Sequence, residues 1–224
     1  MTDKLTLYQL ALGHLGSRRL GSLSEAREPR LTLDDFYAST MAVCLMEGLW
    51  KFAKRVVQID ASTTITPAFG YLYAFPIPPD WVRTISISAN QTLDPPLTDV
   101  PEETGYWYAN WTPIFLSYIS NDPLYGGNLG SWPATFERYF AAQLALDAAP
   151  RITNNDAAII NRLCDENGRG IVRNLRINSR SKDAMNDPPG FAPQSTWVRS
   201  RRGFMAQTPD PASSGASDGG NFFP

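Results

Sequence analysis

The sequence predicts an α+β fold: a helical bundle with an antiparallel β-rich insertion and an extended C-terminal arm. Three observations lead to this prediction. Apolar residues recur at helical spacing early in the chain and again after Gly130, they alternate with a period of two in between, and periodicity is lost from Asn186 onward. We therefore assign residues 1–54 and 131–185 to the bundle, 55–130 to the insertion and 186–224 to the arm.

Two helices are expected before the insertion. Residues 3–16 place apolar side chains on one face and finish at Gly16, a residue type that commonly ends helices. Thr32 is predicted to cap a second helix, which carries acidic residues in its first turn and ends near Ala53. Each helix is expected to bury its apolar face against other elements.

The middle third of the chain has the pattern of short strands separated by proline and Asn/Asp turns. The candidate strands are residues 55–60, 69–75, 82–88, 104–109 and 114–119. We interpret the run YLYAFPIPPDWVRTISI at 71–87 as a hairpin, in which a rigid proline-rich turn joins two alternating strands. The segment GYWYANW at 105–111 is a further aromatic strand, for which core or subunit contact is favoured over stacking on nucleic-acid bases.

A third helix is expected after Gly130, with Ser131 as its cap, Pro133 in its first turn and Pro150 at its end. Phenylalanine, tyrosine, leucine and alanine make this helix apolar nearly all round. Such a helix is typically buried, either inside a bundle or against a neighbouring subunit.

A last helix is predicted over residues 154–180, and it carries a row of arginines. Their spacing places them on one narrow stripe: Arg162, Arg169, Arg173, Arg176 and Arg180. Guanidinium groups suit carboxylates and phosphates, because each offers a planar fork of donors. A solvated helix face, an acidic protein partner and DNA phosphate all remain open, although the net charge of −2 lacks the basic excess of DNA-binding proteins.

The arm is rich in proline, glycine and serine, which cannot bury enough apolar surface to offset chain entropy. It nevertheless contains several large apolar residues, among them Phe191, Trp197, Phe204, Phe222 and Phe223. This composition predicts an arm that orders on a partner.

Catalytic and metal-binding patterns are sparse, and no cofactor or metal site is predicted. His14 is the only histidine and has no metal-ligand spacing around it. Cys44 and Cys164 lie in helical patterns and are expected to be buried, reduced thiols of a protein made in a reducing cytoplasm. Glu102 and Glu103 are the candidate acids of a hydrolase, in an expected loop. No apolar run approaches the roughly 20 residues of a membrane span.

Four stretches resemble the head-to-tail adaptor proteins of short-tailed phages, of the tail tubular protein A type. They are LTLYQLALGHLG at 5–16, GLWKFAKR at 48–55, YAFPIPPDWVRTISI at 73–87 and YISNDPLYGGNLGSWPATFERYFAAQLALDAAPRI at 118–152. The resemblance rests on the order and spacing of these stretches and does not extend into the arm.

The resemblance implies a structural protein of the virion, assembled in the host cytoplasm and placed at the phage neck. Proteins of this family form a twelve-membered ring beneath the portal protein. The ring continues the channel through which double-stranded DNA passes without sequence-specific binding, and it offers a platform to the tail nozzle protein. The implied fold is a helical bundle with a β-rich insertion, and no catalytic residues are implied.

Two partner surfaces follow as hypotheses. The surface expected to face a tail component comprises Tyr71, Tyr73, Phe75, Trp81, Tyr106, Trp107 and Trp111. The arginine row and the arm are expected to contact the portal. Two alternatives stay open: a virion-associated cell-wall hydrolase that uses Glu102 or Glu103, and a nucleic-acid-binding module that uses the arginines and aromatic residues.

Overall fold

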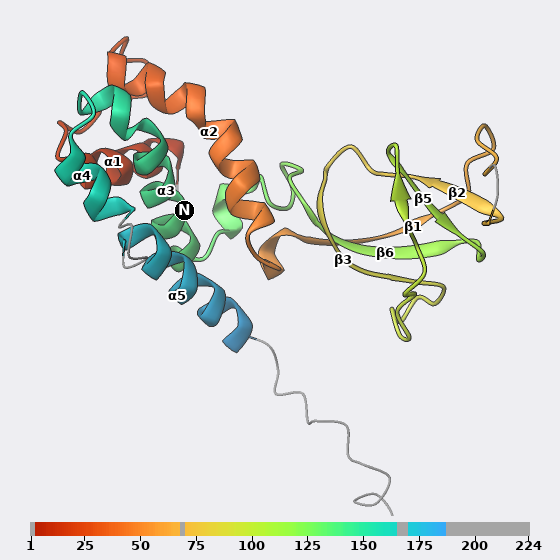
Figure 1. The fold of residues 1–224 in the computed structure, drawn as a ribbon. Coiled ribbons are helices and arrows are strands. Elements are labelled where there is room, and N and C mark those ends of the chain that lie inside the picture. The colour runs from red at the N-terminus through yellow and green to blue at the C-terminus, as the bar shows by residue number, and fades with distance from the viewer. Residues whose placement is uncertain (1–2, 68–69, 165–169, 187–224) are drawn as a thin grey trace, which may run out of the picture. The chain divides into compact units, whose positions relative to one another are not determined.

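The computed structural model describes residues 3–67, 70–164 and 170–186, and it confirms the α+β fold (Figure 1). Within these ranges there are five α-helices and two small antiparallel sheets. The α-helices are α1 (Lys4–Leu15), α2 (Glu28–Met46), α3 (Ala134–Ile152), α4 (Ala157–Leu163) and α5 (Ile171–Met185). The short 3-10 turns η1 (Lys51–Ala53) and η2 (Leu129–Ser131) precede β1 and α3.

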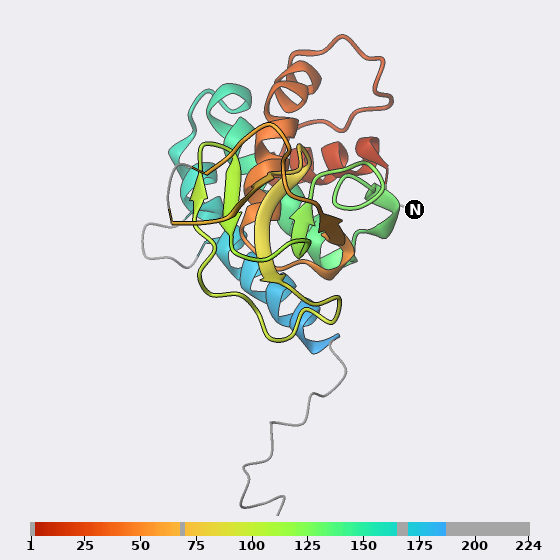
Figure 2. The same ribbon diagram turned by 90° about the vertical axis from the view of Figure 1, so that its right-hand side faces the viewer.

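Helix α3 is the centre of the bundle, and α1, α2 and α5 each pack against it (Figure 1 and Figure 2). Its aromatic residues and its alanines from Ala141 onward are buried, as its apolar surface predicts. Alanine has almost no side chain, so the neighbouring helices lie close to α3 along the alanine positions. The largest aromatic cluster surrounds Phe136, whose ring centroid lies 4.7 Å from Phe52 and 4.8 Å from both Trp50 and Trp132.

The boundaries predicted for the second helix are wrong at both ends. Helix α2 begins at Glu28 with Pro29 in its first turn, where the missing N–H of proline costs nothing. Thr32 is therefore an interior residue, and its hydroxyl donates to the Glu28 carbonyl at 3.0 Å. The helix ends at Met46, and the η1 turn leads on to the first strand at the position predicted for the helix end.

The limits of α3 also differ from the prediction. The helix begins after Pro133, not at a Ser131 cap, because Ser131 belongs to the η2 turn. Pro150 lies inside the last turn and does not end the helix. The turn continues because the Thr153 and Asn155 amides donate to the carbonyls of Ala149 and Pro150, both at 2.9 Å.

The single last helix predicted over 154–180 is in fact two helices. Asp156 caps α4 by accepting a hydrogen bond from the Ala158 amide at 2.9 Å, and α5 begins after Gly170. Glycine lowers helix stability by roughly 1 kcal/mol relative to alanine, which favours a break near this position. Residues 165–169, and with them Arg169, lie outside the described residues.

The six strands form two three-stranded sheets. They are β1 (Lys54–Ile59), β2 (Tyr73–Pro76), β3 (Trp81–Ser88), β4 (Glu102–Glu103), β5 (Tyr106–Ala109) and β6 (Ile114–Ser120). The first sheet has the order β1-β6-β3 and the second has the order β2-β5-β4. A tight turn joins β4 to β5, and Thr104 and Gly105 both have positive φ there, as a two-residue hairpin turn requires.

The predicted hairpin at 71–87 is wrong, because its two strands belong to different sheets. Strand β2 pairs with β5, with Phe75 opposite Trp107, whereas β3 pairs with β6. Pro76, Pro78 and Pro79 lack backbone donors and fix φ, which ends strand pairing here. The Trp81 amide donates to the Pro78 carbonyl at 3.0 Å, in a turn that leads from the second sheet into β3 of the first.

Strand β6 contributes to two cores. Leu116 and Tyr118 on one face pack with Phe75 and Trp107 of the second sheet. Ile119, which points to the other face, packs with the helical core. The described residues up to Asn186 accordingly form one compact unit that contains helices and sheets.

Candidate interaction surfaces

The aromatic surface predicted for a tail component is divided between core and exterior. Phe75 and Trp107 are 0% and 2% exposed, so the prediction of a partner-facing role is wrong for these two residues. They lie opposite each other on the inner face of the second sheet, and Tyr73 packs partly against the same core. Trp81 also belongs to this core, at a ring distance of 6.0 Å from Trp107.

The remaining residues of this predicted surface lie outward. Tyr106 is half-buried, and the Trp111 side chain is 50% exposed. The Tyr71 hydroxyl donates to the Asp99 carboxylate at 2.8 Å, and this hydrogen bond raises the pKa of Tyr71. Leu72, which sequence reasoning missed, is 67% exposed, and its amide donates to the Asn110 side chain at 3.1 Å.

The predicted arginine row does not exist as one stripe, because its members belong to different helices. Arg162 in α4 donates to the His14 carbonyl of α1. Arg176 in α5 pairs with Glu47 at 3.0 Å. These two arginines therefore link elements of the bundle. Arg173 and Arg180 lie on α5 with exposed side chains.

A hollow of about 400 Å³ lies where α2, β3 and α5 meet. We call it the arginine hollow, and it is lined by Val43, Met46, Glu47, Arg83 and Arg180. Val43 and Met46 are about half exposed, at 49% and 55%. Arg83 is held by a hydrogen bond of 3.1 Å to the Met46 carbonyl. The carboxylate of Glu47 is already paired with Arg176. The hollow therefore presents the guanidinium groups of Arg83 and Arg180 beside the apolar side chains of Val43 and Met46.

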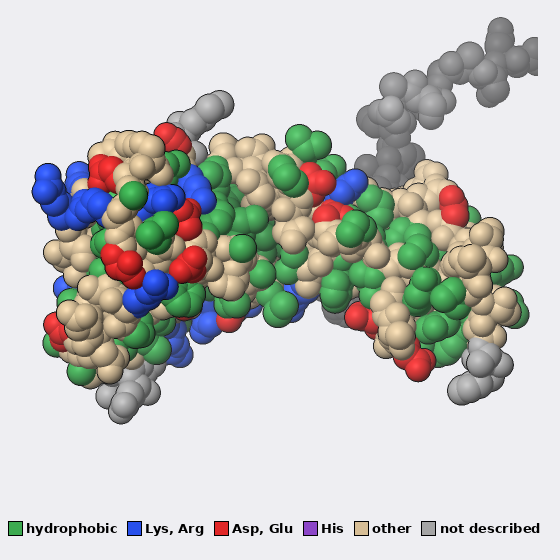
Figure 3. Space-filling view, turned by 90° about the horizontal axis from the view of Figure 1, so that it is seen from above, with side chains coloured by type: hydrophobic (Ala, Val, Ile, Leu, Met, Phe, Trp, Pro, Cys, Tyr) green, Lys and Arg blue, Asp and Glu red, His purple; other side chains and the backbone are tan. Residues whose placement is uncertain are grey.

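Charge is distributed unevenly along the chain. Residues 56–130 contain one cation, Arg83, and seven carboxylates, whereas α5 contains four cations and one carboxylate. In the view of Figure 3, blue and red side chains are interspersed over the helical part on the left, whereas the sheet part on the right shows red side chains and little blue. Four exposed carboxylates lie on the segment from 94 to 103, and we call them the acidic edge: Asp94, Asp99, Glu102 and Glu103.

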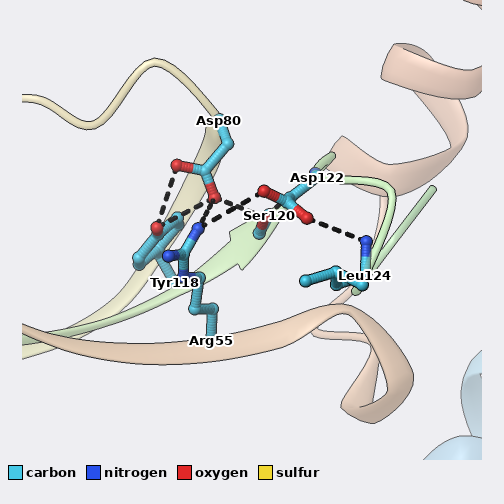
Figure 4. Close-up of polar contacts among 6 residues, drawn as sticks. All are labelled: Arg55, Asp80, Tyr118, Ser120, Asp122 and Leu124. Atoms are coloured by element: carbon cyan, nitrogen blue, oxygen red, sulfur yellow. Dashed lines mark hydrogen bonds and ion pairs between the residues drawn. The ribbon is translucent and has the colours of Figure 1, made fainter. Parts of the chain in front are cut away.

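A partly buried polar cluster holds the strand ends next to the bundle (Figure 4). The Asp80 carboxylate accepts hydrogen bonds from Arg55 at 2.9 Å, Tyr118 at 2.9 Å and Ser120 at 2.5 Å. Partial burial raises the pKa of Asp80, but the hydrogen bonds from Ser120 and Tyr118 and the Arg55 charge outweigh this effect and lower it. Sequence reasoning missed this cluster, since its members come from three separate segments.

The same cluster continues into the turn that leads to α3. Asp122 lies 3.7 Å from Arg55 and accepts a hydrogen bond from the Leu124 amide at 2.8 Å. A side chain at Gly126 would collide with the Ser120 carbonyl, so glycine is required at this close approach. The cluster therefore has a structural role, which is to hold the strands and the turn together.

The candidate catalytic acids are exposed and adjacent in β4, which is a strand and not the predicted loop. Glu102 lies opposite Trp107 and Glu103 lies opposite Tyr106. Adjacent residues of a strand point to opposite faces, and this arrangement does not place two carboxyl groups on either side of one bond.

The sole histidine is part of the bundle. Burial, followed by the Arg162 charge, lowers the pKa of His14. Within residues 3–67, 70–164 and 170–186, no group of three or more His, Cys, Asp or Glu side chains is arranged to hold a metal ion. No helix in the described part of the chain has the length and apolar character needed to cross a membrane.

The two cysteines differ in exposure. Cys44 is buried in the bundle, and burial raises its pKa to about 12, whereas Cys164 is exposed, so the prediction of burial is wrong for Cys164. Cys164 follows the last residue of the short helix α4, and its amide donates to the Ile160 carbonyl at 2.8 Å.

This difference predicts the number of reactive thiols. In native protein, a thiol reagent such as 5,5′-dithiobis(2-nitrobenzoate) is expected to modify one cysteine quickly, because thiolates react and a buried thiol stays protonated. Denaturant should expose the second thiol. Cys164→Ser should abolish the fast reaction and Cys44→Ala should leave it intact; the opposite pattern would contradict the assignment.

The predicted arm falls outside the described residues, including Phe191, Trp197, Phe204, Phe222 and Phe223. Comparison of the sequence with models of known protein families gives no match. Comparison with curated protein sequences also gives no match.

Proposed function

We propose that this chain is a structural subunit of a phage virion, a head-to-tail adaptor that joins the portal to the tail nozzle. In this proposal it forms a homo-oligomeric ring, of twelve copies by resemblance, and continues the channel through which double-stranded DNA passes. It acts by assembly and not by catalysis.

The proposal rests on one observation, which is the order of the helices and strands along the chain. Helices from both halves of the chain pack around α3, and the two sheets are inserted between α2 and α3. This is the arrangement that the resemblance implies. The stretches 5–16 and 118–152, on which the resemblance rests, supply α1, β6 and α3.

The exposed side chains give further support. Thirteen large hydrophobic residues of the described chain are exposed, and several lie on elements that carry the proposed surfaces: Val43, Met46, Leu72, Trp111 and Ile177. Val43 and Met46 lie together in the arginine hollow, and an exposed apolar patch rimmed by charged residues is typical of a surface that contacts another protein. An assembly subunit needs such surfaces on more than one side.

The proposal is tested by mixing the purified full-length chain with portal rings of the same phage. Negative-stain electron microscopy and sedimentation velocity are expected to show an added ring of density on the portal and a corresponding increase in mass. A portal that keeps its original mass at micromolar chain concentrations would contradict the proposal. Cleavage of peptidoglycan that depends on Glu102 or Glu103 would favour the hydrolase alternative.

The arm has a separate test. Replacing Phe222 and Phe223 by serine is expected to weaken portal attachment at least tenfold, because the apolar residues are proposed to anchor the arm. The matched control replaces Ser213 and Ser214 by alanine in the same segment and should bind as the original chain does. Equal binding of all three proteins would contradict the role of the arm.

A further inference from the structure

The arginine hollow and the acidic edge of this chain are complementary in charge and in apolar character. The hollow presents Arg83 and Arg180 beside the half-exposed Val43 and Met46. The rest of α5 adds the exposed Arg173 and Ile177, so the cationic and apolar character extends beyond the hollow. An acidic surface with an exposed apolar side chain would match it.

The second sheet supplies such a surface. The Tyr71 hydroxyl donates to Asp99 of the acidic edge at 2.8 Å, and the next residue in the chain is the exposed Leu72. Glu102 and Glu103 lie on β4, which is the edge strand of the same sheet opposite β2, and their side chains point to opposite faces. No lysine or arginine occurs between Arg83 and Arg138, so no cation of this segment neutralises the acidic edge.

We propose that the occupant of the arginine hollow is a second copy of this chain, which inserts Leu72 and presents its acidic edge to Arg83 and Arg180. Like charges repel, so two hollows do not face each other and neither do two acidic edges. The contact is therefore heterologous, with different surfaces on the two copies. Such a contact leaves one free hollow and one free acidic edge on every dimer, and repetition of it produces a ring if the rotation closes.

This inference deepens the proposed adaptor ring by naming the contact between subunits. Its test uses this chain alone, without portal. Self-association and portal attachment can therefore succeed or fail separately, and their outcomes distinguish the two proposals.

The first measurement is sedimentation equilibrium of the full-length chain over a range of concentrations at low and high salt. Association is expected at low salt and is expected to weaken as salt screens the exposed charges. Arg180→Glu, and separately the double variant Glu102→Lys with Glu103→Lys, are each expected to weaken association roughly tenfold or more, because reversal converts attraction into repulsion. A chain that stays monomeric at low salt would overturn the proposal.

The decisive measurement mixes the two variants. The Arg180→Glu chain keeps its acidic edge, and the double variant keeps its hollow, so together they form one intact contact. Mixing is expected to restore association, because the intact edge of one variant meets the intact hollow of the other, and the two reversed surfaces again carry opposite charges. A mixture that associates no more strongly than either variant alone would overturn the heterologous contact.

Two controls complete the design. Arg138→Glu reverses an exposed arginine of α3 outside the hollow and is expected to associate as the original chain does. Circular dichroism should show that every variant melts at a temperature close to that of the original chain, since the altered side chains are exposed. Loss of association in Arg138→Glu equal to that in Arg180→Glu would show that net charge, and not the hollow, governs assembly and would overturn the proposal.

Discussion

Phe136→Ala is expected to lower the free energy of unfolding by about 3–5 kcal/mol, the largest effect of a single substitution that we predict. The Phe136 side chain is completely buried, and its ring contacts Trp50, Phe52 and Trp132 at centroid distances of 4.7 to 4.8 Å. Removal of the ring leaves a cavity that rigid neighbouring rings cannot fill. Urea unfolding followed by tryptophan fluorescence measures the change.

The control for Phe136→Ala is Trp111→Ala, which removes a larger ring that is 50% exposed. It is expected to change stability by less than about 1 kcal/mol, because little packing is lost. Equal destabilisation by the two substitutions would contradict the placement of the helical core. If Phe136→Ala does not fold, Phe136→Leu provides a smaller change in volume with the same expected direction.

Asp80→Asn is expected to lower the free energy of unfolding by about 2–3 kcal/mol at neutral pH. The substitution keeps the size of the side chain but removes the charge that pairs with Arg55 and one of the two oxygens that accept from the Tyr118 and Ser120 hydroxyls. We expect this loss of stability to be large because the Asp80 side chain is only 15% exposed. The matched control is Asp60→Asn at the exposed end of β1, for which we expect a change within about 0.5 kcal/mol.

The contribution of Asp80 also depends on pH in a defined direction. Its pKa in the folded protein is lowered, so the folded state favours the charged form more than the unfolded state does. The stabilisation is therefore complete above the ordinary aspartate pKa of about 3.9 and is lost as pH falls through the lower folded value. Urea unfolding at several pH values should show the difference between the original chain and Asp80→Asn shrinking below about pH 4, and a difference that grows there would contradict this account.

The helices and strands could be predicted largely because they are local patterns. The period of apolar residues located α1, α3 and all the longer strands, and the alanine-rich sequence of α3 predicted its burial. The predictions were wrong where a local sequence pattern is compatible with two different structures. Thr32 has the chemistry of a cap but lies inside α2, and the arginine spacing fits one helix although the chain forms two.

Pairing between distant segments was not predictable in the same way. The prolines near Pro78 predicted where strand pairing ends, but they do not say which strands pair. Strand β2 pairs with β5, and β3 pairs with β6. The exposure of strand residues was not predictable from the local pattern either. Alternation separates Trp107 from Tyr106, but it does not say which of the two faces is the inner one.

The sequence by itself determined the fold class, the positions of most elements, the uneven charge and the resemblance to phage adaptors. Only the tertiary structure decided which aromatic residues form the core, which arginines link helices, and how Arg83 and Arg180 come together beside Val43 and Met46. The physical reason is the range of the forces concerned. Backbone hydrogen bonding and side-chain periodicity act over a few residues, whereas burial and ion pairing depend on contacts between segments that are far apart in the chain.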